Sequence, residues 1–301
     1  AGHESQLQLS TQLKMLTLNR IFFVTLLSLG VLNSVTGNRL TVEEVLARVN
    51  RIPAKLQNVL AQVTNEVDFK LPRRGDNSTR IVGGTATTIE DYPHQIALLY
   101  GGRQICGGSI ISHTWVATAA HCVDYYPQNE DLTIRAGSSS RSSGGSIHAV
   151  YYYHIHENYS PDYYPYDVAT IRVRTPFSGV ARVIPLTTAE WIAGTEATVT
   201  GWGVNAAGQT PDNLFRVSLP VVDRITCNEQ WMGEITDDMI CAGAVGIDAC
   251  SGDSGGPAVQ NGVLYGIVSW GATACGNGMF GVYTNIAHPS IRDFIWRTSM
   301  V

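Results

Sequence analysis

Short runs of alternating apolar and polar residues recur along the chain from Ile81 onward. Gly, Pro, Asn and Ser, which are typical of turns, separate these runs. Alternation with a period of two indicates β-strands that bury one face. The pattern predicts strands at residues 95–100, 133–136, 168–173, 198–201 and 264–270. So many short strands predict an all-β fold, either a barrel or a sandwich.

Helical spacing occurs in two other places. At the C-terminus, Ile291, Phe294 and Ile295 fall on one face of residues 289–300, which predicts a single helix. Residues 38–80 also carry apolar positions at helical spacing, and Thr41 and Glu44 there form a capping-box pattern. Pro53 interrupts this second pattern, so we expect a short amphipathic helical hairpin.

The N-terminal residues have the layout of a secretory signal. Residues 1–14 show no apolar period and have no predicted role, whereas Met15 and Arg20 precede an apolar run at 21–32. Small residues follow, so we assign residues 15–37 as a signal peptide. The alternative is a membrane span, but this run is shorter than the roughly 20 residues that a span needs. We therefore expect a secreted, extracellular protein with no membrane association once the signal is removed.

Composition and charge narrow the class of protein. Hydrophobic residues make up 44% of the 301 residues and charged residues 15%, which excludes a charge-rich disordered chain and a coiled coil. The net charge of −5 argues against a nucleic-acid partner. Residues 1–80 carry a net charge of +4 and residues 81–301 carry −9. This asymmetry indicates that residues 1–80 and residues 81–301 are two parts that are processed differently.

The cysteines and sequons also indicate secretion. All six cysteines lie after residue 100, and an even number confined to one segment indicates three disulfides. A zinc site is the alternative, but no pair has C-x-x-C spacing. Asn77 and Asn158 begin glycosylation sequons, although Pro161 weakens the second. Asn77 lies in a polar stretch, 71–80, that resembles a linker exposed to proteases.

Two motifs carry the chemistry. His121 stands in Thr-Ala-Ala-His-Cys, and Ser254 stands in Cys-Ser-Gly-Asp-Ser-Gly-Gly-Pro. Glycines around a serine allow positive φ and bring backbone N–H groups close to a substrate. A serine hydroxyl needs a base within hydrogen-bond reach, and an imidazole titrates in the right range. Together these motifs resemble those of the trypsin-like serine proteases, and the resemblance covers residues 81–301.

The resemblance implies two packed antiparallel six-stranded β-barrels, at about 81–185 and 186–301, with the catalytic site between them. It implies Ser254 as nucleophile and His121 as general base and then acid. Asp167, which opens a predicted strand, is the expected carboxylate partner of the histidine. Asp162 is the nearest alternative, but it lies in a loop rich in Tyr and Pro and should be solvated. The backbone N–H groups of Gly252 and Ser254 would form the oxyanion hole.

The same resemblance implies specificity for basic side chains. Asp248 lies six residues before Ser254, where the family places the base of its primary specificity pocket. A surface acid is the alternative reading, although the fixed offset from Ser254 disfavours it. Ala249 stands where a serine is common, Ser251 replaces a common Gln, and the loop 242–247 is short. The other residues expected to bind substrate are Gly271 and Gly281 in the pocket wall and Ser269, Trp270 and Gly271 as a substrate-pairing edge strand.

The resemblance further implies activation by cleavage between Arg80 and Ile81, after which the new amino group of Ile81 pairs with Asp253. It implies that the catalytic reaction uses no cofactor and no metal. Residues 136–146 lack the acidic residues of the family's calcium loop, so we expect no calcium there. The implied disulfides are Cys106–Cys122, Cys227–Cys241 and Cys250–Cys275.

Other conspicuous residues have plainer interpretations. His154 and His156 lie two apart on a predicted strand, and without a third ligand nearby they are expected to be surface polar residues. The tyrosines between Tyr151 and Tyr166 are expected to edge the cleft on the non-primed side of the substrate.

These observations predict a secreted zymogen of a serine endopeptidase that cleaves after Arg, and less well after Lys. Its partners would be protein and peptide substrates and protein protease inhibitors, and it would be a monomer. One alternative is a catalytically dead homologue that serves as a binding module, but such a protein should have lost a catalytic residue. Another is a protease of narrow specificity in an activation cascade. The absence of a cysteine-rich module before residue 80 favours a digestive role like that of invertebrate trypsins.

Overall fold

The computed structural model describes residues 83–126, 129–205 and 208–301. The predicted signal peptide, the helical pro-segment at 38–80, the Asn77 sequon and the Arg80–Ile81 bond lie outside these residues. Within the described part of the chain, no helix is both long enough and apolar enough to cross a membrane.

The first barrel is built from the strands of the first half of the described chain. Neighbouring strands are antiparallel, and β5 pairs with β2, so the sheet closes on itself in the order β2-β3-β4-β7-β6-β5. The strands are β2 (Gln95–Tyr100), β3 (Arg103–Ser112), β4 (Trp115–Thr118), β5 (Leu132–Ala136), β6 (Ser146–Ile155) and β7 (Ala169–Val173). The short 3-10 helices η1 (Ala120–Cys122) and η2 (Asn129–Asp131) lie between β4 and β5.

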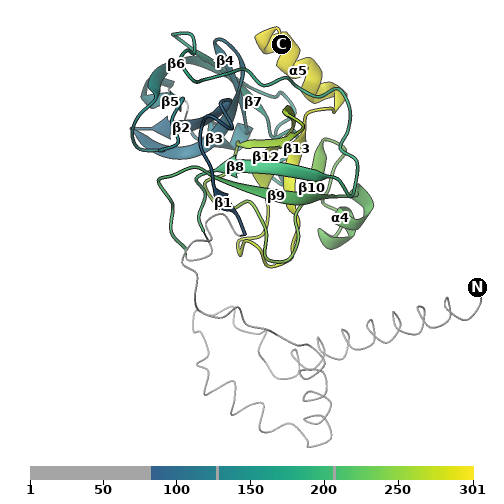
Figure 1. Cartoon of the computed structure of the whole chain (residues 1–301). Coiled ribbons are helices and arrows are strands. Elements are labelled where there is room, and N and C mark those ends of the chain that lie inside the picture. Colours follow the sequence, from purple (N-terminus) through teal and green to yellow (C-terminus); the bar gives the residue numbers. More distant parts are fainter. Residues whose placement is uncertain (1–82, 127–128, 206–207) are drawn as a thin grey trace, which may run out of the picture. The chain divides into compact units, whose positions relative to one another are not determined.

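The second barrel follows the same plan. Its strands run in the order β9-β10-β13-β12-β11-β8, and pairing of β8 with β9 closes the sheet. They are β8 (Glu196–Gly201), β9 (Phe215–Val222), β10 (Met239–Ala242), β11 (Pro257–Gln260), β12 (Val263–Trp270) and β13 (Gly281–Asn285), and β1 (Thr85–Ala86) adds to the edge at β9 (Figure 1). The described residues thus form two antiparallel six-stranded barrels, which confirms the predicted architecture.

The helices match the sequence prediction at one place and differ at another. The C-terminal helix α5 (Pro289–Ser299) is confirmed, with Pro289 in its first turn. The helix α4 (Arg224–Gln230) was not predicted, because strands and loops were expected throughout this region. Its seven residues are too few to show an apolar period, and its start depends on Asp223, whose carboxylate accepts a hydrogen bond from the backbone N–H of Thr226.

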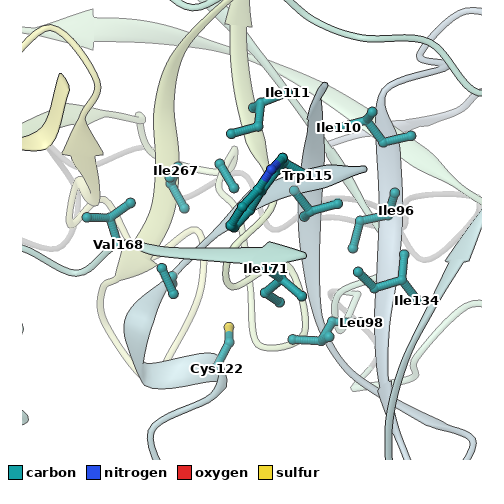
Figure 2. Packing of buried hydrophobic residues seen from close by; sticks show 14 of the residues in the cluster. Ile96, Leu98, Ile110, Ile111, Trp115, Cys122, Ile134, Val168, Ile171 and Ile267 are labelled. Carbon is teal, nitrogen blue, oxygen red and sulfur yellow. The ribbon is translucent and has the colours of Figure 1, made fainter. Parts of the chain in front are cut away.

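The hydrophobic core of the first barrel extends into the second. Strand β2 is buried on both faces, because Ile96 and Leu98 point into its own barrel while Ala97 and Leu99 pack with Trp202 beyond β8. Figure 2 shows Ile267 of β12 in the same cluster as Trp115 and the isoleucines of the first barrel. The two barrels therefore share a continuous apolar contact that fixes their relative positions.

The helix α5 adds a second connection. It follows β13 of the second barrel, yet its buried residues Ile291, Phe294 and Ile295 join the core of the first barrel. In Figure 1 this yellow helix lies beside β7. The C-terminal end of the chain thus holds the first barrel against the second.

The loop between β5 and β6 is organised by a guanidinium group. Arg135 donates hydrogen bonds to the backbone carbonyls of Arg141, Ser142 and Gly144. The hydroxyl groups of Ser140 and Ser142 donate to the two carboxylate oxygens of Asp212, at 2.7 and 2.6 Å, and so connect this loop to the segment before β9. The carboxylate that holds this loop therefore comes from the other barrel.

Candidate active site

A histidine and a buried aspartate form the centre of the site. The carboxylate oxygen Oδ2 of Asp167 lies 2.8 Å from Nδ1 of His121, and Oδ1 accepts the backbone N–H of His121 at 3.0 Å. An ionised carboxylate only accepts hydrogen bonds, so Nδ1 must carry the proton of a neutral imidazole. The other ring nitrogen, Nε2, is then left as a free base.

Asp167 is held by residues of both barrels. It precedes β7 in the first barrel and is 1% exposed. From β12 of the second barrel, Ser269 donates its hydroxyl to Oδ2, and from β13 the hydroxyl of Thr284 donates to the backbone carbonyl of Asp167 at 2.6 Å. The alternative carboxylate, Asp162, is exposed to solvent, as its loop position predicted.

His121 is fixed by the structure around it. It lies in η1, which the disulfide Cys106–Cys122 ties to β3. The ring of Tyr164 meets the imidazole edge-on, with ring centroids 5.5 Å apart. The imidazole is therefore restrained by a covalent bridge behind it and an aromatic ring beside it, while its side chain remains 20% exposed.

Ser254 lies in a glycine-rich loop that contacts both barrels. Its carbonyl accepts the N–H of Gly107 on β3 at 2.7 Å, and the N–H of Gly255 donates to Val268 on β12 at 2.8 Å. Gly255 has φ +75°, and a Cβ there would lie 2.1 Å from Oγ1 of Thr118. A side chain at this position would thus be strained and would clash, which explains the glycine after the serine.

Asp253 is a second buried carboxylate, directly before Ser254. It is fully buried, and it accepts the N–H groups of Gly203 at 2.8 Å and Cys250 at 2.9 Å. Burial raises the pKa of Asp253 to about 6, although these two hydrogen bonds act in the opposite direction. A cation that reached this carboxylate would therefore be bound strongly. Its expected partner, the amino group of Ile81, lies outside the described residues.

His121 and Ser254 line one cavity of about 330 Å³, and Asp248 lies in the same cavity. Asp248 is 4% exposed and accepts the N–H of Gly276 at 3.1 Å. Burial raises the pKa of Asp248 to about 6. This arrangement provides a pocket with a single anionic group, which suits a long cationic side chain.

The pocket stays open because two glycines face it. A Cβ at Gly281 would lie 3.2 Å from Oδ1 of Asp248, and a Cβ at Gly271 would lie 3.7 Å from Cα of Gly281. Ala249 and Ser251 also line the cavity, and Ala249 contributes only a methyl group. Burial also raises the pKa of Tyr283, so its hydroxyl in the cavity lining remains protonated.

The expected substrate-pairing edge is only the end of a strand. Strand β12 is internal for most of its length, since it pairs with both β11 and β13. Its pairing with β11 begins at Ile267, so Ser269 and Trp270 extend beyond that neighbour while Trp270 still pairs with Val282 of β13. One side of this strand end is therefore available to an extended peptide.

The three disulfides of the structure are Cys106–Cys122, Cys227–Cys241 and Cys250–Cys275, the pairings that the resemblance implies. Among the described residues, one group of potential metal ligands comes together, and it consists of Cys106, His121 and Cys122. Both cysteines of this group are oxidised in one disulfide, so they offer no thiolate to a metal.

Two expectations about other aromatic residues need correction. His156 was expected on the surface, but it is 2% exposed, and its ring nitrogens contact Ser290 Oγ and the backbone N–H of Asn158. Of the tyrosines expected at the cleft, Tyr164 lines the cavity, whereas Tyr152 packs edge-on against Trp115. An alternating pattern shows which side of a strand a residue faces, but not whether another element covers that side.

Thr284 and Asp238 were not recognised from the sequence. Thr284 supports Asp167 from the opposite barrel, and the carboxylate of Asp238 accepts the backbone N–H of Tyr166. Neither residue belongs to a motif, and both contacts join positions that are more than 70 residues apart. Their roles become visible only once the barrels are packed.

Comparisons with known proteins agree with this geometry. The trypsin family model matches residues 81–295. Trypsin beta of Drosophila erecta is 43% identical over 215 residues, which cover 69% of this chain and 85% of that protein. Trypsin alpha of Drosophila melanogaster is 41% identical over 215 residues, and trypsin alpha-4 of Lucilia cuprina is 42% identical over 214 residues. Both matches cover 69% of this chain and 84% of the relative.

The raised pKa of Asp248 predicts pH-dependent binding of cations in the pocket. Below a pH of about 6 the carboxyl is protonated, and a bound cation must displace that proton. The affinity for a small aryl amidinium ion should therefore be constant above about pH 7 and fall about tenfold for each pH unit below about 6. Calorimetric titration between pH 5 and pH 8 measures this dependence.

The matched variant for this titration is Asp248→Asn, which should bind the amidinium weakly and without this pH dependence. An affinity that stays constant down to pH 5 in the unsubstituted protein would contradict the assigned protonation of Asp248.

Proposed function

The chain belongs to the trypsin family of serine endopeptidases, and we propose that it is a secreted digestive zymogen that cleaves after Arg and, less well, after Lys. Members of this family hydrolyse peptide bonds of protein substrates and are bound by protein inhibitors. The observation that carries the proposal is one cavity lined by His121, Ser254 and the buried carboxylate of Asp248, with Asp167 paired to His121 from behind the lining.

Ser254 and His121 carry out the first step together. Nε2 of His121 takes the hydroxyl proton as Oγ of Ser254 attacks the scissile carbonyl carbon, and the carbonyl π electrons move to its oxygen. Asp167 accepts the Nδ1 hydrogen bond throughout and stabilises the imidazolium that forms. The imidazolium then gives its proton to the leaving amine, and the C–N bond breaks to leave an acyl-enzyme. Water releases the acid by the same steps, with His121 acting again as base and then acid.

The developing oxyanion is stabilised by the backbone N–H groups of Gly252 and Ser254. Gly252 has φ +99°, a conformation that a side chain would oppose, and its carbonyl accepts a hydrogen bond from Gln104 at 3.2 Å. This contact supports the loop in one orientation. The loss of one such donor typically costs about 2.7–4 kcal/mol of transition-state stabilisation.

Asp248 selects the side chain before the scissile bond. A guanidinium group can form a bidentate pair with a carboxylate, whereas a lysine ammonium is shorter and needs further acceptors for its three donors. The methyl group of Ala249 offers no acceptor. Arg is therefore the preferred side chain.

Secretion, activation and the digestive role are supported by the sequence. The signal-like segment at 15–37 and the sequons Asn77 and Asn158 support secretion. Asp253 is fully buried and lacks a cationic partner among the described residues, and a new amino group at Ile81 would compensate its charge, which supports activation by cleavage after Arg80. Residues 1–80 contain no cysteine, which favours a digestive enzyme over a cascade protease with a cysteine-rich module. The active enzyme is a monomer.

The catalytic roles predict a large and non-additive loss of activity. Ser254→Ala and His121→Ala should each lower kcat by at least about 10⁴-fold while leaving the fold intact, because the residues act as a unit. The double variant should be little slower than either single variant. Hydrolysis of an Arg peptide by the activated enzyme measures this, and Ser218→Ala on the exposed face of β9 is the matched control. If Ser254→Ala retained more than about a hundredth of kcat, another residue would be the nucleophile.

The proposed activation predicts one new N-terminus. After activation by an added trypsin-like protease, N-terminal sequencing should begin at Ile81, and Arg80→Gln should leave the protein inactive. Arg74→Gln, a nearby change in the same linker, should activate normally. Any N-terminus of the active form other than Ile81 would overturn this activation scheme.

The small side chain at Ala249 predicts a preference between the two basic residues. One poorly satisfied donor in a closed pocket costs about 1–3 kcal/mol. Arg substrates should therefore exceed Lys substrates by roughly tenfold or more in kcat/KM. A matched pair of peptides measures this, and Ala249→Ser should reduce the ratio by supplying a hydroxyl. Equal rates in the unsubstituted enzyme, or a ratio that Ala249→Ser leaves unchanged, would refute the role of Ala249.

A further inference from the structure

A fourth buried carboxylate, that of Asp238, does not belong to the cavity lining. Asp238 directly precedes β10 of the second barrel and is 2% exposed. Its Oδ1 accepts the hydroxyl of Thr236 at 2.6 Å, and its Oδ2 accepts the backbone N–H of Tyr166 at 2.6 Å. The second bond reaches the residue that immediately precedes Asp167. Asp238 therefore contacts the backbone one residue before the catalytic carboxylate of Asp167.

The backbone that Asp238 holds has an unfavourable conformation. Tyr166 has φ +51°, and Tyr163 and Tyr164 in the same loop have φ +64° and +54°. Residues with bulky side chains rarely adopt this left-handed region, so surrounding contacts must maintain it. The carbonyl of Tyr166 accepts the N–H of Val168 at 2.7 Å, which closes a tight turn centred on Asp167. The direction of the Asp167 side chain thus depends on the conformation of Tyr166.

The side chain of Tyr166 is also held, by two imidazole rings. The ring of His156 stacks on it with centroids 4.8 Å apart and an angle of 16°, and His288 meets it edge-on at 5.8 Å. His156 itself is fixed by Ser290 and the backbone N–H of Asn158. These ring contacts restrain the side chain, whereas the N–H bond to Asp238 fixes the peptide plane between Pro165 and Tyr166, on the N-terminal side of the left-handed residue before Asp167.

We propose that Asp238 is a positioning residue for catalysis, which holds the left-handed Tyr166 through its backbone N–H and so aims the Asp167 carboxylate at His121. The inference rests on the roles proposed above for Asp167 and His121. Asp238 and Asp167 come from different barrels, so this bond makes the geometry of the pair depend on how the barrels pack. The hydroxyl of Thr236 occupies the other oxygen of Asp238, which leaves Oδ2 directed at Tyr166.

The positioning role predicts a defect in kcat rather than in substrate binding. Without the acceptor, the Tyr166 peptide can relax from its left-handed conformation, and the Asp167 carboxylate shifts relative to Nδ1 of His121. Misplacement of a catalytic group by about 1 Å costs on the order of a hundredfold in rate. Asp238→Ala should lower kcat by about 10- to 100-fold, with KM for a short Arg peptide changed less than about threefold. The specificity pocket at Asp248 is left intact.

The experiment compares four variants of the full chain after activation. Asp238→Ala removes the acceptor, and Asp238→Asn keeps an oxygen that can accept the N–H of Tyr166. Asp212→Ala is the control, because the exposed Asp212 carboxylate also accepts hydrogen bonds across the two barrels but holds the loop of Ser140 and Ser142 instead of the segment before Asp167. Asp167→Asn tests the underlying assignment. Competent sites are counted with a covalent serine reagent, so kcat refers to folded enzyme only, and melting temperatures are recorded in parallel.

The expected result is a 10- to 100-fold loss of kcat in Asp238→Ala, recovery to within about threefold of the unsubstituted enzyme in Asp238→Asn, and unchanged kcat in Asp212→Ala. A lower melting temperature with unchanged kcat per competent site would show a purely structural role and overturn the inference. Equal losses in Asp238→Asn and Asp238→Ala would also overturn it, because the acceptor would then not be what matters.

Two further outcomes separate the inference from the proposed function. Full activity in Asp167→Asn would refute the catalytic assignment itself, whereas loss there with normal kcat in Asp238→Ala would refute the positioning role alone. If Asp238→Ala gives no folded enzyme, Asp238→Ser replaces it. The serine hydroxyl is one bond shorter than the carboxylate, so it cannot replace Oδ2 as the acceptor for the N–H of Tyr166. The same loss of kcat and the same recovery by Asp238→Asn are then required.

Discussion

The buried carboxylate of Asp167 is the constraint on which the site depends. A charge that is 1% exposed is costly unless hydrogen-bond donors surround it, and here the donors come from both barrels. The backbone and ring of His121 contribute from the first barrel, and Ser269 contributes from the second. Relative movement of the barrels would remove the Ser269 hydrogen bond and leave the buried charge with fewer donors. The catalytic geometry and the packing of the barrels are therefore stabilised by the same contacts.

The other buried acids show how environment assigns different roles to one side chain. Asp248 and Asp253 are both buried with a pKa near 6, so each favours a cationic partner. Asp248 faces an open cavity that can admit a cationic side chain from outside, whereas Asp253 is fully buried and does not line that cavity. Asp238 does not line the cavity, and its carboxylate accepts a backbone hydrogen bond from Tyr166. Solvent access and the supply of N–H donors separate these roles.

The sequence was sufficient for features that are encoded locally. Period-two alternation located strands such as β2 and β12, and helical spacing of apolar residues located α5. The motifs around His121 and Ser254 gave the family and, through it, the barrels and the disulfide pairings. Helix α4 was missed because seven residues carry no readable period.

The contacts that the sequence did not reveal join distant positions. The hydroxyl of Thr284 reaches Asp167, and Asp238 reaches Tyr166, only after two barrels have closed and packed together. His156 was expected to be a surface polar residue, yet α5 brings Ser290 and Phe294 onto it and buries it. Such burial depends on tertiary packing, which local patterns of hydrophobicity do not contain.

Asp167 fixes the proton of neutral His121 on Nδ1 and leaves Nε2 unprotonated as the base. Nitrogen NMR of enzyme labelled at the histidine ring measures this directly, with His121→Ala used to assign its signals. At a pH where the imidazole is neutral, Nδ1 should be protonated and Nε2 unprotonated. Asp167→Asn should abolish this preference, because an amide can also donate to Nδ1. A proton found on Nε2 in the unsubstituted enzyme would contradict the account.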